Sequence, residues 1–301
     1  MYIFHSISEL MRRLGQPKPL HPLIAIARYG DMQVDPGDVG QSLALDFYKI
    51  SYKRDFKGQV RYGQGYYDFE EGGLAFLSPH QVVTMSGEEP GYEGLTLFFH
   101  PDFIRNYPLG KAIGRYGFFS YAVSEALYLS DREKQVIAAL FDNMLRELEN
   151  NIDGFSQDIM VSQIELLLNY SNRFYNRQFL TRKAVYNDLI YQMDAHLAER
   201  FDTGSGLPTV QDVSEHLRVS PRYLSDMLKT LTGRNTQQYI HDRLIEKAKD
   251  ILSTSNRSVA EIAYQLGFEH PQSFNRLFRQ KAHLSPVAYR RSFTPPSSDL
   301  P

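Results

Sequence analysis

Residues 258–281 read S-V-A-E-I-A-Y-Q-L-G-F-E-H-P-Q-S-F-N-R-L-F-R-Q-K, and residues 209–229 repeat their pattern. The earlier copy reads T-V-Q-D-V-S-E-H-L-R-V-S-P-R-Y-L-S-D-M-L-K. Matching positions lie 49 residues apart at the start of the copies and 50 apart from Pro221 and Pro271 onward. The extra residue therefore falls between two helices, where a turn absorbs it. The plainest interpretation is a duplicated helix-turn-helix unit, because such units read DNA and a pair can read two grooves.

Each copy carries the local signals of two helices. Thr209 and Ser258 suit N-caps, and a carboxylate stands three residues after each, where it completes a capping box. A proline opens each second helix, at a position that needs no amide proton. Gly267 ends the first helix of the later copy, where a left-handed residue costs little. Arg218 stands there in the earlier copy, which predicts a turn that is built differently.

The second helix of each copy has an apolar face and a polar face. The apolar residues at helical spacing are Leu224, Met227 and Leu228 in one copy and Phe274, Leu277 and Phe278 in the other. The polar positions are Arg222, Tyr223, Ser225, Asp226 and Lys229 in one copy, and Gln272, Ser273, Asn275, Arg276 and Arg279 in the other. These ten residues are the candidate DNA-binding set. The alternative is that they form only a solvated helix surface.

Together with the closing S-P-V-A-Y-R-R at 285–291, this pattern resembles the signature of AraC/XylS-type transcription regulators. The resemblance covers roughly residues 184–293. It implies a bacterial, sequence-specific DNA-binding domain of about seven helices, in which the second helix of each unit enters the major groove. His283 departs from the usual glycine, which the first copy keeps as Gly233. The departure implies either a left-handed histidine or a remodelled turn.

The resemblance also implies roles for the polar faces. We expect Arg222, Gln272, Asn275 and Arg276 to read base edges, while the surrounding Lys and Arg contact phosphates. Asp226 is unusual, because a carboxylate repels phosphate. It either accepts from a cytosine amino group or pairs with a neighbouring cation without touching DNA.

Residues 236 to about 252 predict one helix between the units, with Asn235 as its cap. A helix of that length spans roughly 25 Å. The two second helices would then lie about one DNA turn, roughly 34 Å, apart. One chain would read two adjacent major-groove segments, and its site would be long and asymmetric.

Composition limits the rest of the interpretation. A chain of 301 residues is long enough for two domains, and the lack of cysteine removes disulfides and thiolate metal sites. The sequence begins without a signal-peptide pattern and has no apolar run of about 20 residues, so we expect a cytoplasmic protein that does not enter a membrane.

Residues 181–301 hold 16 Lys/Arg and 13 Asp/Glu, whereas residues 1–180 hold 17 Lys/Arg and 22 Asp/Glu. This surplus of cations is modest for a DNA-binding domain, so their placement carries more weight.

Short apolar or alternating runs punctuated by Gly, Pro and Asp fill residues 20–120, which favours a β-sandwich or barrel. The resemblance implies a cupin-like fold for this part. The expected fold class is α+β multidomain: a cupin-like β-barrel with flanking helices, followed by an all-α domain with two helix-turn-helix units. The expected domains are residues 1–182, for effector binding and dimerisation, and residues 183–301, for DNA binding. The polar stretch 172–183 is the expected junction.

A metal-dependent cupin enzyme needs H-x-H with a further Glu and His. The histidines here are widely spaced, and His80 and His100 lie next to prolines at expected turns. We therefore expect no metal, no cofactor and no catalysis. A cupin enzyme or sugar-binding module fused to a DNA-binding domain is the alternative.

The resemblance implies that the first domain senses a small molecule bound inside its barrel. The region is rich in Tyr and Phe, which suit the walls of a site for a small, partly apolar ligand. The alternative is that these residues are ordinary barrel core and surface tyrosines. Weak candidates for effector contacts are Tyr48, Tyr62 and Tyr67. Lys49, Lys53 and Arg54 either face an anion or point outward. The alternative is a constitutive regulator whose first domain is only structural. An activator would also contact RNA polymerase.

Two amphipathic helices precede the junction. Ser130 and Glu133 form a capping box ahead of the first, and the second covers about 155–177. The resemblance implies that a helix here pairs with its counterpart in another subunit, so a homodimer is a hypothesis.

Overall fold

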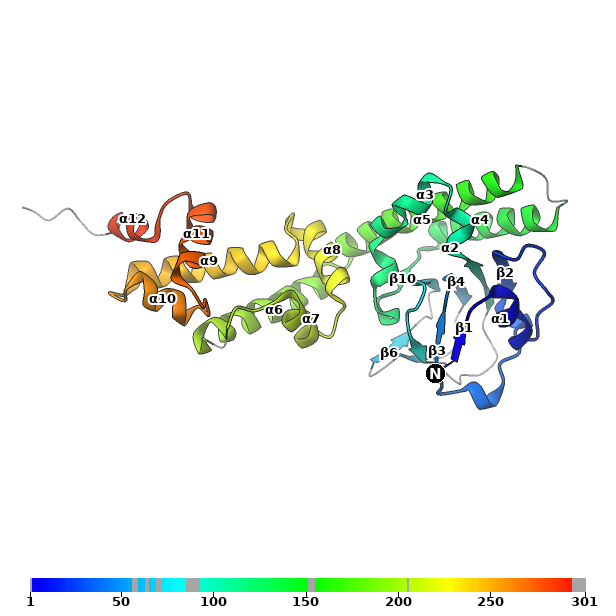
Figure 1. Cartoon of the computed structure of the whole chain (residues 1–301), viewed down its shortest axis with the longest axis horizontal. Coiled ribbons are helices and arrows are strands. Elements are labelled where there is room, and N and C mark those ends of the chain that lie inside the picture. Colours follow the sequence, from blue (N-terminus) through cyan, green and yellow to red (C-terminus); the bar gives the residue numbers. More distant parts are fainter. Residues whose placement is uncertain are drawn as a thin grey trace, which may run out of the picture. The chain divides into compact units, whose positions relative to one another are not determined.

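The computed structural model describes residues 2–55, 59–62, 65–68, 72–84, 93–150, 155–204 and 206–293. Its contacts divide the chain into two compact units, residues 1–181 and residues 182–301. Among the described residues, all strands lie in the first unit, and the regular elements of the second unit are helices (Figure 1). The expected fold class, α+β multidomain, is confirmed.

The main sheet of the first unit has five strands in the order β10-β7-β4-β9-β2, all antiparallel. Their bounds are β2 Ile24–Arg28, β4 Tyr48–Asp55, β7 Gly73–Leu77, β9 Glu93–Phe99 and β10 Leu127–Tyr128. A second sheet contains β1 (Tyr2–Phe4), β3 (Ser42–Leu45) and β8 (Val83–Thr84), and β5 (Gln59–Tyr62) pairs with β6 (Gly65–Asp68). The described strands thus form three sheets.

Different layers cover the two faces of the main sheet. On one face, α1 (Ile7–Arg13) packs in a buried cluster with Phe4 and Leu45 of the second sheet and Phe98 of β9. On the other face, Tyr52 of β4 stacks on Phe141 of α4 (Asp131–Glu149) with ring centroids 5.7 Å apart. Further short helices are α2 (Pro101–Ile104), α3 (Pro108–Ala112) and 3₁₀ turns at Tyr29–Asp31, Pro36–Asp38, Ile113–Arg115, Gly117–Ser120 and Val123–Glu125.

The helix α5 (Ser156–Thr181) continues beyond the expected end near residue 177. The expectation that 172–183 is a polar junction is therefore wrong for most of that stretch. Phe174 and Phe179 are buried, and the Gln178 side chain accepts a hydrogen bond of 2.8 Å from the amide of Tyr128. Arg177 donates to Glu133 at 3.0 Å. These polar residues point at the sheet and α4, which their composition alone did not indicate.

The described residues of the second unit contain seven helices, the number that the resemblance implies. They are α6 Lys183–Thr203, α7 Val210–Leu217, α8 Pro221–Thr232, α9 Thr236–Thr254, α10 Val259–Gln265, α11 Pro271–Ala282 and α12 Pro286–Arg291. Both predicted capping boxes are present: Thr209 with Asp212, and Ser258 with Glu261. Asn235 caps α9 as expected, accepting from the amide of Gln238 at 2.9 Å.

The first helices of the two units are followed by a left-handed residue in the same way, but the turns differ in length, as predicted: two residues separate Arg218 from Pro221, and three separate Gly267 from Pro271. Arg218 is left-handed, with φ 56°, and Gly267 has φ 89°. The amide of Val219 donates to the Ser214 carbonyl at 3.0 Å, as Phe268 does to Ala263 at 3.0 Å. These bonds offset the cost of about 1–2 kcal/mol for a left-handed residue with a side chain.

Candidate nucleic-acid interface

The helices α8 and α11 each bury an apolar face and expose a polar one. Leu224, Met227 and Leu228 of α8 and Phe274 and Phe278 of α11 are buried. All five candidates on α11 are exposed: Gln272, Ser273, Asn275, Arg276 and Arg279. On α8, Arg222 and Lys229 are exposed, while Ser225 and Asp226 are half-buried. Each second helix therefore presents side chains that match the donors and acceptors of base edges and phosphates.

Tyr223 departs from this pattern. It is 8% exposed, and its hydroxyl lies 3.0 Å from the hydroxyl of Tyr186 on α6. The side chain joins α8 to α6 inside the unit, so the structure does not place it on the polar face. A tyrosine at the edge of a helix face can turn either way, and the partner on α6 is distant in sequence.

Replacing Tyr223 by phenylalanine is expected to lower the free energy of unfolding by about 1 kcal/mol, because one buried hydrogen bond is lost. The affinity for DNA should change less than about twofold. Denaturant unfolding and a fluorescence-anisotropy DNA titration measure the two quantities. The control is Tyr264→Phe, since Tyr264 is 56% exposed in the same unit. A large loss of DNA affinity without a loss of stability would instead make Tyr223 a DNA contact.

Asp226 pairs with Arg222 in this structure. The Arg222 Nε donates to the Asp226 carboxylate at 3.0 Å across one helical turn. Of the two roles left open for Asp226, pairing with a neighbouring cation is the one present without DNA. By contrast, the side chains of Arg276 and Arg279 have no hydrogen-bond or ion-pair partner among the described residues. Arg276 and Arg279 on α11 are therefore more available for contacts with DNA than Arg222 on α8.

One helix carries both units. In Figure 1, α8 lies at the start of α9, and α11 lies beside α9 further along it, with α10 and α12 near its other end. Both second helices end in a left-handed residue, Gly233 with φ 74° and His283 with φ 59°. His283 therefore occupies the turn that usually takes glycine, which is the first of the two predicted outcomes. Its amide donates to the Arg279 carbonyl at 3.0 Å, and this bond closes the helix.

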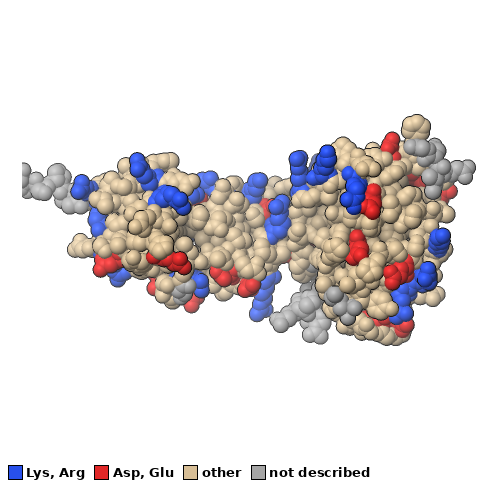
Figure 2. Space-filling view, in the orientation of Figure 1, with Lys and Arg blue, Asp and Glu red and all other residues tan. Residues whose placement is uncertain are grey.

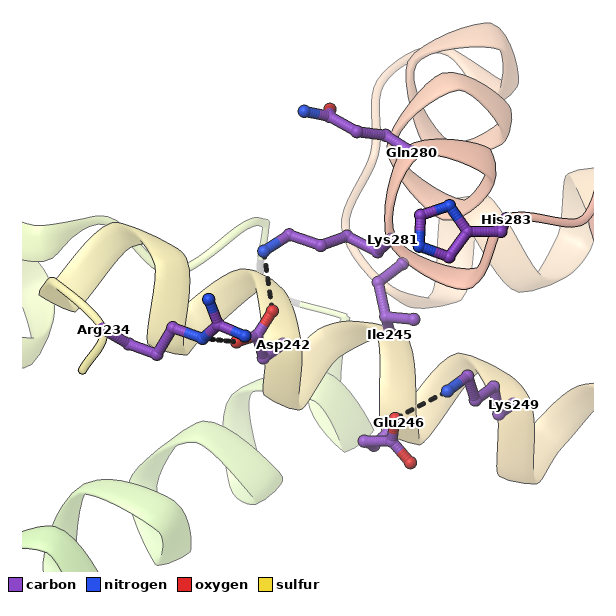
Figure 3. A pocket seen from close by; sticks show the side chains of 8 residues that line it. All are labelled: Arg234, Asp242, Ile245, Glu246, Lys249, Gln280, Lys281 and His283. Atoms are coloured by element: carbon purple, nitrogen blue, oxygen red, sulfur yellow. Dashed lines mark hydrogen bonds and ion pairs between the residues drawn. The ribbon is translucent and has the colours of Figure 1, made fainter. Parts of the chain in front are cut away.

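A charged hollow of about 380 Å³ lies between the end of α8 and the end of α11 (Figure 3). Asp242 of α9 accepts from Lys281 of α11 at 2.7 Å and pairs with Arg234, just after α8, at 3.2 Å. One carboxylate therefore links both helix-turn-helix units. Sequence reasoning missed Asp242 and Arg234, because their positions have no counterpart in the repeat.

Charge is unevenly distributed over the helical unit. In the face shown in Figure 2, Lys and Arg gather mainly along the upper edge, over α8 and α11, and Asp and Glu mainly along the lower edge. Arg290 of α12 has a contact inside the unit: its Nε donates to the Leu252 carbonyl at the end of α9, at 3.2 Å. On the second helices themselves, Arg222, Lys229, Arg276 and Arg279 are all exposed.

The effector candidates of the first unit are only partly described. Tyr48 stacks on Phe99 with ring centroids 4.9 Å apart and meets Phe119 edge-on at 5.0 Å. It therefore packs in the layer between sheet and helices, and burial raises its pKa. The side chains of Tyr62 and Tyr67, in β5 and β6, lie outside the described residues.

The histidines near prolines have local roles. His80 is left-handed, with φ 65°, and lies 3.1 Å from the Asp46 carboxylate, while His100 caps α2. Within the described ranges, no three His, Asp or Glu side chains converge as a metal ion would require. In those same ranges, no helix is long and apolar enough to cross a lipid bilayer.

Two helix-turn-helix units on one helix, joined to a β-sheet domain, define the class of two-domain DNA-binding regulators. A family model described as a helix-turn-helix domain matches residues 213–292. A model described as an AraC-like ligand binding domain matches residues 44–164. The chain belongs to the AraC family of transcriptional regulators, a family of regulators and not of enzymes. The resemblance noted in the sequence is confirmed.

Individual relatives match part of the chain. The HTH-type transcriptional activator RhaS of Escherichia coli (strain SE11) is 30% identical over 147 residues, 48% of this chain and 50% of that protein. The raffinose operon transcriptional regulatory protein RafR of Pediococcus pentosaceus is 34% identical over 98 residues, 33% of this chain and 34% of that protein. The chain thus spans about a third to a half of the length of these curated relatives. The solved C-terminal domain of AraT, a response regulator from Geobacillus stearothermophilus, is 27% identical with a TM-score of 0.33, covering 37% of this chain and 91% of that one.

Proposed function

We propose that the chain controls transcription by placing α8 and α11 in two neighbouring major-groove segments, and that a small molecule bound in the first unit modulates this binding. The observation that carries the proposal is the pair of polar helix faces, one on α8 and one on α11, that the single helix α9 connects. This connecting helix has 19 residues, which corresponds to about 28 Å. With the width of the units added, this spacing suits second helices about one DNA turn apart.

The free cations on α11 support sequence-specific binding. Arg276 and Arg279 lie three residues apart and are exposed, and Gln272 and Asn275 share the same side of the helix. Arg pairs with guanine and Asn or Gln with adenine through two hydrogen bonds. We propose Arg222, Ser225, Asp226 and Lys229 as the corresponding set on α8.

Selection of bound fragments from random DNA tests the proposal. We expect the full chain to enrich a long asymmetric site containing two different short sequences, centred about 10 base pairs apart. Enrichment of no sequence, or equal competition by heparin at moderate salt, would contradict it. Selection with and without a pool of metabolites then tests the effector. Enrichment that no metabolite alters would favour the alternative of a constitutive regulator.

The hollow around Asp242 yields a further prediction. Asp242 pairs with Arg234 and with Lys281 and so offsets part of their positive charge (Figure 3). In the proposed complex, DNA passes close to these three residues as it runs from α8 to α11. In Asp242→Asn we expect tighter binding to cognate and scrambled DNA alike and a salt slope steeper by about one to two ions. Stability should fall by no more than about 1 kcal/mol, since these pairs are partly exposed. DNA titrations at several salt concentrations measure the slope. A loss of affinity for cognate DNA alone would instead show that Asp242 positions the second unit.

A homodimer and contact with RNA polymerase in activation stay predictions. The helix α5 exposes Ile159 at 42% and Leu166 at 45%, seven residues apart on one side. Two apolar residues at that spacing are typical of a helix that pairs with another. Light scattering at micromolar concentration should give twice the chain mass of 34.7 kDa, and a monomer mass would count against the dimer.

A further inference from the structure

The first turn of α8 contains an arginine that is bonded to a carboxylate of the next turn. The Arg222 Nε donates to the Asp226 carboxylate at 3.0 Å. The two residues lie four positions apart, so they are neighbours on one side of the helix. The Arg222 side chain is 49% exposed and that of Asp226 is 26% exposed. The pair therefore lies on the polar face of α8, with the cation the more exposed of the two.

The bond to Asp226 uses only one of the donors of Arg222. A guanidinium has five N–H donors, one on Nε and four on the two terminal nitrogens. The terminal nitrogens of Arg222 have no hydrogen-bond partner among the described residues. Two N–H groups of an arginine match O6 and N7 of guanine in the major groove. The pair thus leaves Arg222 able to bind one guanine through both terminal nitrogens.

The buried side of α8 fixes the direction in which the pair leaves the helix. Tyr223 is 8% exposed, and its hydroxyl lies 3.0 Å from that of Tyr186 on α6. Leu224 is fully buried. Arg222 and Asp226 are therefore held on the outer side, in the first two turns of α8. In helix-turn-helix proteins, the N-terminal residues of the second helix are those that contact base edges.

We propose that Asp226 is a positioning residue, which holds Arg222 in the geometry that binds a guanine in the segment contacted by α8. The inference rests on the proposed function and names the base and the residues that set specificity in the first unit. Ordering a free arginine at an interface weakens binding by about two- to tenfold, and Asp226 orders Arg222 before DNA binds. This advantage offsets the repulsion between a carboxylate on this face and the phosphates.

The second unit has a different arrangement. At the offset of 50 between the copies, Gln272 takes the place of Arg222, and Arg276 takes the place of Asp226. The arginine of α8 thus lies in the first turn of its helix, and that of α11 lies one turn later. We therefore expect guanine at different positions of the two segments, so that the selected site is not a direct repeat.

Fluorescence-anisotropy titrations of the full chain on modified duplexes test the proposal. The relevant segment of the selected site is the one that Arg276→Ala still recognises. Each of its guanines is replaced in turn by 7-deazaguanine, which lacks N7, or by hypoxanthine, which keeps O6 and N7. At one position, 7-deazaguanine should weaken binding about fivefold or more, whereas hypoxanthine should not. Arg222→Ala should bind the three duplexes equally, and discrimination that persists in this variant would overturn the proposal.

Variants of Asp226 test its positioning role. Asp226→Ala should lower the discrimination between guanine and 7-deazaguanine by about two- to tenfold, because Arg222 is no longer held. Asp226→Asn keeps an acceptor oxygen for Nε and should retain more of it. In the Arg222→Ala background, Asp226→Ala should change the discrimination no further, a coupling that a merely structural role would not produce.

The matched control is Asp188→Ala on α6. Asp188 is exposed and likewise accepts a hydrogen bond from a side chain four residues on, that of Gln192. Its removal should leave the discrimination unchanged. Thermal unfolding should change little in Asp188→Ala and in Asp226→Ala, because exposed pairs of this spacing contribute little to stability.

Two results would overturn the role of Asp226. If Asp226→Ala keeps the full discrimination and binds cognate and scrambled DNA more tightly alike, Asp226 only repels phosphate. If it loses the preference for a cytosine while keeping that for guanine, Asp226 contacts a base itself. Failure of the proposed function gives another pattern, in which the unmodified chain does not distinguish the selected duplex from a scrambled one.

Discussion

Replacing Gly267 by alanine is expected to disrupt the second helix-turn-helix unit and lower the free energy of unfolding by more than about 3 kcal/mol. Gly267 has φ 89°, and an alanine Cβ would lie 2.5 Å from the carbonyl carbon of Gly206 and 2.8 Å from the amide of Leu207. Both neighbours are backbone, so the segment that leads into α7 would have to shift. The left-handed conformation alone contributes about 1–2 kcal/mol. Denaturant unfolding followed by circular dichroism measures the change.

The matched control is Gly233→Ala in the first unit. Gly233 is also left-handed, with φ 74°, but an added Cβ would meet nothing within 4 Å. Only the conformational cost of about 1–2 kcal/mol should remain there. Equal effects of the two substitutions would show that the close approach between 206–207 and 267 is absent in solution.

Arg276→Ala is expected to weaken binding to the selected DNA by about 1–3 kcal/mol, which corresponds to about 5- to 150-fold. Arg276 is exposed on α11 and has no partner among the described residues, so its donors are available to a guanine. Stability should not change, because the side chain contributes little to packing. Titrations of cognate and scrambled duplexes measure the specificity ratio.

Arg279→Ala is the comparison on the same helix. A phosphate contact should weaken binding to cognate and scrambled DNA by similar factors and lower the salt slope by about one. If Arg276→Ala behaves in that way too, Arg276 contacts phosphate and the base-reading assignment is wrong.

The helical unit could be predicted from sequence because its signals are local. Caps, opening prolines and apolar spacing recur in both copies, and each is formed by residues within a few positions of each other. The left-handed conformation of Arg218 could not be predicted, because two backbone hydrogen bonds stabilise a conformation that side-chain preference disfavours. Tyr223 was misplaced because its partner, Tyr186, lies on α6, 37 residues away.

The sites that depend on distant contacts could not be predicted in the same way. Asp242 links the units through Arg234 and Lys281, which are brought together only when α11 packs on α9. On β4, alternation separates two faces but does not say which is inside. Only the strand register, with Phe98 beside Lys49, decides that the lysines face α1 and that Tyr48 faces the helices.

Methylation interference on the selected DNA tests the central claim most directly. With one full-length chain per duplex, we predict two blocks of interfering guanines in adjacent major grooves, about 10 base pairs apart on one face of the helix. Arg276→Ala should remove interference from one block and leave the other in place. A single block, or two symmetric blocks that require two chains, would contradict the claim that α8 and α11 of one chain bind two adjacent major-groove segments.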